Sequence, residues 1–249
     1  MSGHSKWATI KRSKGKTDAA RGKLFNRLIR EITIAARMGG GEINSNPRLR
    51  SAISSARAAN MPNKNVESAI QKGTGTLEGV TYEEITFEGY GPGGIAVMIE
   101  CMTDNRNRTV AEVRHGLTKY GGNLGQSNSV AWMFKSKGVF RIAKDVMAED
   151  ALMELVLEAG AEDMQLDGDE FEITTAMESF ESVRAALEKA NIQPSSAELA
   201  KIADNPVKVE GENVGKVVRL IEALDDLDDT QHVYANYDIS DEDLEKYAE

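Results

Sequence analysis

The chain has 249 residues, 41% of them hydrophobic, which is enough for one large domain or two to three small ones with real cores. Its formal net charge is −10, but residues 1–78 hold 15 Lys and Arg against 5 Asp and Glu, a balance of +10, so residues 79–249 have a balance of −20. At physiological ionic strength, charges more than about 8 Å apart are largely screened, and a ligand senses the patch that it contacts. The acidic total therefore does not exclude a nucleic-acid partner.

The sequence has no apolar run near the roughly 18 residues of a membrane span, and its polar start has no apolar signal region. These features predict a cytoplasmic protein with no membrane partner. The single Cys101 lies in the apolar run GIAVMIECM, where it is typical of a small buried hydrophobic residue in a reducing compartment.

The chain begins MSGHSKWATIKRSKGK, a basic arm without a single acid. A solubilising tail would have a similar composition. DNA or RNA is the favoured partner, because the basic character continues onto a predicted helix and an aromatic ring in the arm can stack on a base. The arm residues predicted to bind nucleic acid are Lys6, Trp7, Lys11, Arg12, Lys14 and Lys16.

A helix is predicted from Asp18 to Met38, where apolar residues recur at helical spacing until GGG at 39–41 ends the run. At about 100° per residue, the apolar side chains point to one side of this helix. Four cations form a narrow stripe on the opposite side, and this stripe is also predicted to bind nucleic acid: Lys23, Arg27, Arg30 and Arg37.

Two shorter helices complete a predicted bundle over residues 1–78. Asn46 as N-cap and Pro47 at the first helical position begin one helix, which ends before Pro62. Asn63 is the predicted N-cap of the other helix, which ends at Gly73. The start of this helix carries residue types that suit base edges or phosphates, although capping alone would explain the asparagines: Asn63, Lys64 and Asn65.

After a linker at 74–79 the pattern changes to strands, at 82–88 and 94–102, which predict a hairpin. The connection matches G-x-G-x-x-G at 89–94, but it leads into a strand and not a helix, so a tight turn is favoured over a dinucleotide site. A helix at 110–120, with Thr109 and Glu112 as a capping box, and a strand at 127–134 follow.

Arg106 and Arg108 stand just before that predicted helix, whose N-terminal amides favour a phosphate. The Gly-rich loop at 121–129 lies close enough in sequence to cover the same ligand. Pairing of both arginines with nearby acids is an equally good interpretation, since surface ion pairs are common. Both alternatives stay open.

Residues 136–204 show a β-α-β-β-α-β pattern, which predicts a ferredoxin-like unit. The remaining helix at 212–226 and strand at 231–238 are expected to return to the earlier strands. The predicted fold class is α+β multidomain, an N-terminal three-helix bundle plus two α/β units. The predicted domains are 1–78, the discontinuous 79–135 plus 205–240, the insertion 136–204, and an acidic tail, 241–249.

No catalytic constellation is present in the sequence, whose three histidines are scattered and whose only cysteine lacks an activating neighbour. Four acids could gather Mg²⁺, but acids at a helix end more often form a solvated face: Asp225, Asp226, Asp228 and Asp229. The sequence predicts neither an enzyme nor a cofactor or metal site.

Several segments together resemble the YebC family, over nearly the whole chain: GHSKWATIKRSKGKTDAARGKLFNRLIREI, NPRLRSAI, YEEITFEGYGPGGIAVMIECMTDNRNRTVAEVRHGLTKYGGNLG and LEAGAED. The resemblance implies three domains and a cytoplasmic regulator of gene expression. Bacterial members are mostly described as probable DNA-binding transcriptional regulators, whereas mitochondrial relatives activate translation. The prediction is a nucleic-acid-binding transcriptional regulator, and the alternative is a translation factor bound to ribosomal RNA. The acidic α/β domains are predicted to face protein partners.

Overall fold

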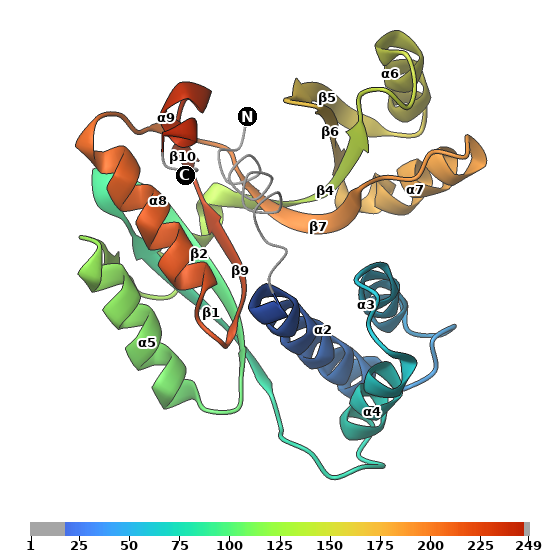
Figure 1. Cartoon of the computed structure of the whole chain (residues 1–249), viewed down its shortest axis with the longest axis horizontal. Coiled ribbons are helices and arrows are strands. Elements are labelled where there is room, and N and C mark those ends of the chain that lie inside the picture. The colour runs from blue at the N-terminus through green and yellow to red at the C-terminus, as the bar shows by residue number, and fades with distance from the viewer. Residues whose placement is uncertain (1–17, 247–249) are drawn as a thin grey trace. The chain divides into compact units, whose positions relative to one another are not determined.

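The computed structural model describes residues 18–246. This part of the chain divides into two compact units, one formed by residues 18–131 with 207–246 and the other by residues 132–206. None of the described helices is both long and apolar enough to cross a membrane. The two units are described separately below, and Figure 1 labels their elements.

The first unit begins with a bundle of three helices, α2 (Asp18–Gly39), α3 (Pro47–Ala58) and α4 (Asn63–Gly73), as the sequence predicts. Asn46 caps α3, since its side chain accepts from the Leu49 N–H at 3.0 Å and donates to the Ala35 carbonyl of α2 at 2.8 Å. Helix α4 packs closely on α2, because a Cβ at Gly73 would lie 2.4 Å from the Thr33 carbonyl oxygen. The bundle core includes Ile32, Leu49, Ile53, Met61 and Val66.

The N-cap of α4 differs from the prediction. Pro62 occupies the cap position, and its side chain makes no capping hydrogen bond. Asn63 is the first helical residue, because the backbone at Pro62 already has the extended ψ of 137° that a cap position requires.

A four-stranded sheet forms the rest of the first unit, in the order β3-β1-β2-β9. Its strands are β1 (Glu83–Tyr90), β2 (Ala96–Thr103), β3 (Asn123–Leu124) and β9 (Thr230–Ala235). The β1–β2 hairpin turns through the short helix η1 (Pro92–Gly94), where Gly93 and Gly94 have φ of 76° and 78°. The predicted turn is therefore confirmed.

Two helices, α5 (Arg106–Lys119) and α8 (Glu212–Asp225), lie side by side (Figure 1), and a Cβ at Gly116 would lie 3.1 Å from the Leu224 side chain. Both helices contribute to one core with the sheet, which includes Val97, Ile99, Leu117, Val217 and Leu220. Strand β9 pairs with β2, so the predicted return of the last helix and strand to the earlier strands is confirmed. Cys101 is buried in this core, and burial raises the pKa of its thiol to about 12.

Helix α5 begins earlier than predicted. Asn105 is its N-cap and accepts from the Arg108 N–H at 3.2 Å. The predicted cap, Thr109, lies in the first turn and is fully buried, where its hydroxyl hydrogen-bonds to the Asp229 carboxylate. Thr109 therefore binds the buried Asp229, which is distant in sequence, and does not cap the helix.

The predicted strand at 127–134 is wrong for most of its length. The buried carboxylate of Glu88 accepts at 2.7 Å from each of the N–H groups of Asn128, Val130 and Ala131. These three donors are then used by a side chain and cannot form a strand ladder. Residues 131–133 form the short helix η2 (Ala131–Met133), and only Phe134 enters a strand.

The second unit has the predicted ferredoxin-like order of elements. They are β4 (Phe134–Ala143), α6 (Glu149–Glu158), β5 (Ala161–Asp167), β6 (Glu170–Ala176), α7 (Phe180–Lys189) and β7 (Ser196–Ala203). The sheet is antiparallel in the order β5-β6-β4-β7. Its core includes Phe140, Ile142, Leu152, Ile173 and Leu187.

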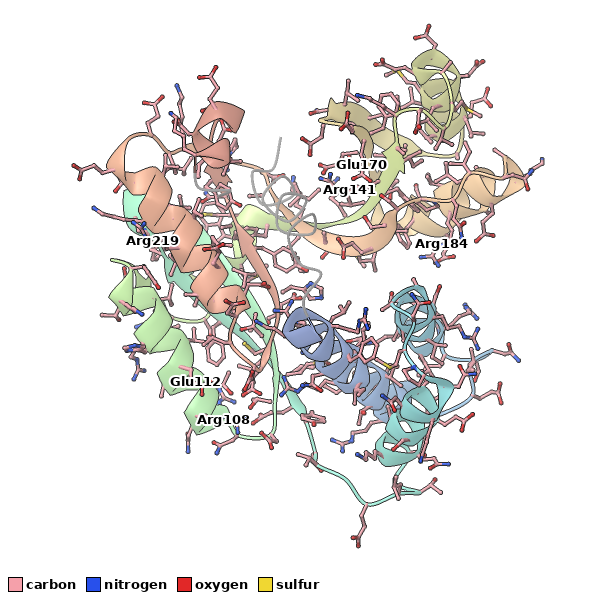
Figure 2. All side chains as sticks on the ribbon, in the orientation of Figure 1. Arg108, Glu112, Arg141, Glu170, Arg184 and Arg219 are labelled. Atoms are coloured by element: carbon pink, nitrogen blue, oxygen red, sulfur yellow. The ribbon has the colours of Figure 1, made fainter. Side chains whose placement is uncertain are left out.

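One buried cation lies among acids in this second unit. Arg141 of β4 is 4% exposed, and its guanidinium lies 3.2 Å from Asp167 and 3.6 Å from Glu170, with Glu172 also in contact. Figure 2 labels Arg141 and Glu170 side by side. Charges buried in this way need such partners, so we assign this cluster a structural role.

The end of the chain differs from a simple acidic tail. Two short strands, β8 (Val207–Lys208) and β10 (Tyr237–Asp238), pair in parallel before it. Residues 241–245 form helix α9 (Asp241–Glu245), which begins after Ser240 as N-cap. Leu244 is fully buried in the core of the first unit. This one apolar side chain therefore anchors an otherwise acidic segment.

Candidate nucleic-acid interface

The cationic stripe of α2 points away from the bundle core, but it has anionic partners within the chain. These partners form an acidic segment at residues 225–229, where α8 ends and the chain turns toward β9. Lys23 Nζ lies 2.9 Å from Asp226 Oδ1, and Arg27 Nη2 lies 2.9 Å from Asp225 Oδ1. The two cations at the N-terminal end of the stripe are therefore already paired with acids of the chain.

The next two cations of the stripe also have partners. Arg30 Nη2 lies 3.2 Å from Asp229 Oδ1, and Arg30 also donates to the Asp228 carbonyl. Arg37 is exposed and donates to the Tyr82 carbonyl at 3.2 Å and to Thr81 Oγ1 at 3.3 Å. Of the four, Arg37 alone has no acid beside it in the described part of the chain.

Asp229 joins three elements. Its side chain has no exposed surface, and it accepts hydrogen bonds from Thr103 at 2.9 Å, Thr109 at 2.8 Å and Arg108 at 2.7 Å. Burial opposes its ionisation, but the hydrogen bonds from Arg108, Thr109 and Thr103 outweigh burial and hold the pKa of Asp229 below its usual value of 3.8. Of the four acids that could gather Mg²⁺, Asp225, Asp226 and Asp229 pair with cationic side chains, and residues 18–246 contain no group of ligands that could hold a metal.

The two arginines near the start of α5 differ in their partners. Arg108 pairs with Asp104 at 2.8 Å and with Asp229 at 2.7 Å, so it has the acidic partners of the ion-pair interpretation. Arg106 is exposed in the first turn of α5, and it forms no ion pair with any described residue. Figure 2 shows Arg108 and Glu112 at this end of α5.

The start of α4 presents the predicted polar residues to solvent. Asn63 and Lys64 are exposed and Asn65 is half-buried. Because no side chain caps this helix, capping does not explain why an asparagine stands at position 63. Lys64 pairs with no acid within residues 18–246.

Two further cations of the bundle, Arg50 and Arg57 of α3, were not singled out from the sequence. Both are exposed, and neither pairs with an acid in the part of the chain that the structure describes. Arg48, by contrast, lies 2.7 Å from both Glu31 and Glu84. The sequence does contain a signal for these cations. Residues 43–66 have no Asp or Glu but include four basic residues, Arg48, Arg50, Arg57 and Lys64.

The predicted arm residues Lys6, Trp7, Lys11, Arg12, Lys14 and Lys16 lie outside the described residues. In the described bundle, the exposed cations with no acidic partner include Arg50, Arg57, Lys64 and Arg37. Together with the charge balance of residues 1–78, they make the bundle the cationic part of the chain.

The fold and this distribution of charge define a multidomain α+β protein with a basic helical bundle. The chain belongs to the TACO1/YebC family. The family model described as the TACO1/YebC protein N-terminal domain matches residues 5–76, and the model for the TACO1/YebC second and third domain matches residues 82–237.

Curated relatives match over essentially their whole length. A probable transcriptional regulatory protein of Koribacter versatilis is 57% identical over 248 residues, covering 100% of both chains. One of Geobacter sulfurreducens, with the same description, is 54% identical and covers 99% of both chains. The crystal structure of a conserved hypothetical protein from Aquifex aeolicus has a TM-score of 0.83 and 46% identity, and covers 90% of this chain and 93% of that chain. The family is one of regulatory proteins.

Proposed function

We propose that this protein is a nucleic-acid-binding regulator that acts on transcription by binding DNA. The observation that carries the proposal is the basic bundle, whose exposed cations on α3 and at the start of α4 have no acidic partner within the described residues. Phosphate contacts of this kind supply most of the sequence-independent affinity for DNA. The descriptions of the curated relatives support transcription as the process.

The proposed interface combines the arm with the bundle. It includes the arm residues Lys6, Trp7, Lys11, Arg12, Lys14 and Lys16, and the start of α4 at Asn63, Lys64 and Asn65. The stripe residues Lys23, Arg27 and Arg30 join it only when they leave the acidic segment, whereas the exposed Arg37 and Arg106 need no such change. Arg108 is also paired, with Asp104 and Asp229, so it too must leave its acidic partners before it can bind a phosphate.

The acidic unit at residues 132–206 has a different proposed role. It holds 7 Lys and Arg against 16 Asp and Glu, a balance of −9, which repels phosphate on average. We assign this unit to contacts with protein partners, and no catalytic role is proposed for any residue of the chain.

The test is to crosslink the full-length protein in growing cells and sequence the nucleic acid recovered with it. Enrichment of a limited set of promoter fragments is the expected result. Recovery of ribosomal RNA without promoter DNA would contradict the proposal and favour a translation factor. A variant without residues 2–16 should recover less DNA than the full chain, because it lacks five cations of the arm.

A further inference from the structure

Helix α3 has two different faces. Its buried face packs in the bundle core through Leu49, Ala52, Ile53 and Ala56. At about 100° per residue, Arg50, Ser54 and Arg57 fall together on a stripe outside this face, and all three are exposed. With a rise of about 1.5 Å per residue, the two arginines start about 10 Å apart along the helix axis.

Beside this stripe, the side chains of Ser51, Ser55 and Ala58 are exposed, small and uncharged, so the helix backbone can come close to a partner there. The half-buried Arg48, which pairs with Glu31 and Glu84, borders this patch. A helix of this kind can approach the major groove of duplex DNA, which is about 12 Å wide. The flanking arginines can then reach the phosphates on its edges.

The start of α4 adds a third cation. Lys64 is exposed in the first turn, and the N-cap residue of α4 makes no side-chain hydrogen bond to that turn. The first N–H groups of a helix have no partner within the helix, and the positive end of its dipole favours an anion. Lys64 and this turn therefore suit a phosphate group.

We propose that the exposed face of α3, with the first turn of α4, is a docking surface for the phosphate backbone of duplex DNA, and that Arg50, Arg57 and Lys64 bind its phosphates. The surface is complementary to DNA in charge, since residues 43–66 carry no acid. On α2, three of the four stripe cations already lie beside acids of the chain, so α3 offers the more accessible cations. This inference rests on the proposed function.

The test is a triple variant of the full chain, R50Q/R57Q/K64Q. Binding to a random duplex DNA of fixed length is measured over a range of salt concentrations. Each lost phosphate contact reduces the slope of log K against log salt by about 0.9 for duplex DNA, so the slope should become shallower by about 2.7. The three side chains are exposed, so the melting temperature should be unchanged within a few degrees.

The control is R114Q/K216Q/R219Q, with the same change in net charge. These three cations are exposed on α5 and α8, where Figure 2 labels Arg219. The inference predicts a slope change below 1 for this control. The same change in both variants would show that only net charge matters, and would overturn the inference.

Two more outcomes are decisive. Unchanged binding of DNA by the folded α3 variant would overturn the docking surface while leaving the proposed function in place. Failure of the unaltered chain to bind DNA at any salt concentration would overturn the proposed function itself. An RNA hairpin serves as a second probe, and a slope change that appears with RNA but not with DNA would also contradict the inference. The single variant R57Q, with an expected change of about 0.9, provides an independent measurement.

Discussion

The guanidinium of Arg30 in α2 lies 3.2 Å from the carboxylate of Asp229, whose side chain is completely buried. The same arginine lies over the ring of Tyr82, with 5.6 Å between the guanidinium carbon and the ring centroid. The other carboxylate oxygen of Asp229 accepts hydrogen bonds from Arg108, Thr103 and Thr109. One buried carboxylate thus connects the bundle, β2 and α5, and two arginines lie beside its charge.

The first prediction concerns this carboxylate. Changing Asp229 to Asn leaves two arginines without their buried anion, and removal of one partner from a buried pair typically costs about 3–5 kcal/mol. Because Arg108 is 42% exposed and can regain water, we expect a loss of about 3 kcal/mol. The measurement is the free energy of unfolding in urea.

Asp228→Asn is the matched control, since it makes the same charge change one residue away. Asp228 is exposed, and it is the backbone carbonyl of this residue that accepts from Arg30. We expect a change within about 0.5 kcal/mol. Equal losses in the two variants would show that net charge, and not the buried contact, is responsible.

The second prediction is a pH dependence from Glu88. Burial opposes ionisation of this carboxyl, but hydrogen bonds from the N–H groups of Val130, Asn128 and Ala131 outweigh burial and lower its pKa below the ordinary 4.5. A lowered pKa in the folded state contributes stability that is present above pH 4.5 and is lost as the pH falls below it.

The variant Glu88→Gln tests this contribution. At pH 7 it should be less stable than the natural chain by about 1–3 kcal/mol, because the buried Val130 N–H and the part-buried N–H groups of Asn128 and Ala131 lose their charged acceptor. The difference should stay constant between pH 7 and pH 5.5 and become smaller below pH 4.5. A difference that is the same at pH 7 and pH 3.5 would contradict the assignment.

Local features of the fold could be predicted because they depend on neighbours in sequence. Asn46 and Pro47 identify the start of α3, and the spacing of Leu49, Ala52, Ile53 and Ala56 identifies its buried face. The ferredoxin-like order follows from the alternation of strand and helix patterns in 136–204. These features need no information about distant residues.

The partners of the α2 stripe could not be predicted in this way. Helical periodicity shows that Lys23, Arg27 and Arg30 lie opposite the core, but it does not show what covers that face. The covering acids lie 198 or more residues away, so only the tertiary structure brings the two groups together. The roles of Thr109 and of the loop around Asn128 cannot be predicted from the sequence for the same reason, since their partners are the distant Asp229 and the Glu88 side chain.

The third prediction tests whether the second unit is an independent insertion. Phe134 at the start of β4 pairs directly with Ala203 at the end of β7, so the strands that begin and end the unit lie side by side. Replacing residues 132–206 with a short Gly/Ser linker should therefore leave β9 able to pair with β2. We expect a single cooperative melting transition for this shortened chain, and loss of cooperativity would show that the division is wrong.

The last prediction concerns the competition between the acidic segment and DNA for α2. Changing Asp225 and Asp226 to Asn removes the carboxylates that lie 2.9 Å from Arg27 and Lys23. Partly exposed pairs of this kind contribute about 0.2–1 kcal/mol each, so the fold should persist. If DNA uses the α2 stripe, the two released cations should steepen the slope of log K against log salt by up to about 1.8.

The control for this measurement is E78Q/E83Q, which removes the same charge from two exposed acids that form no ion pair with any described residue. Long-range repulsion falls equally in both variants, so the difference between their slopes isolates the released cations. A steeper slope in D225N/D226N alone means that the acidic segment occupies a phosphate-binding surface in the free protein. Equal slopes, with a small loss of stability in D225N/D226N, would mean that the α2 pairs only hold the bundle in place and that DNA contacts the arm and α3.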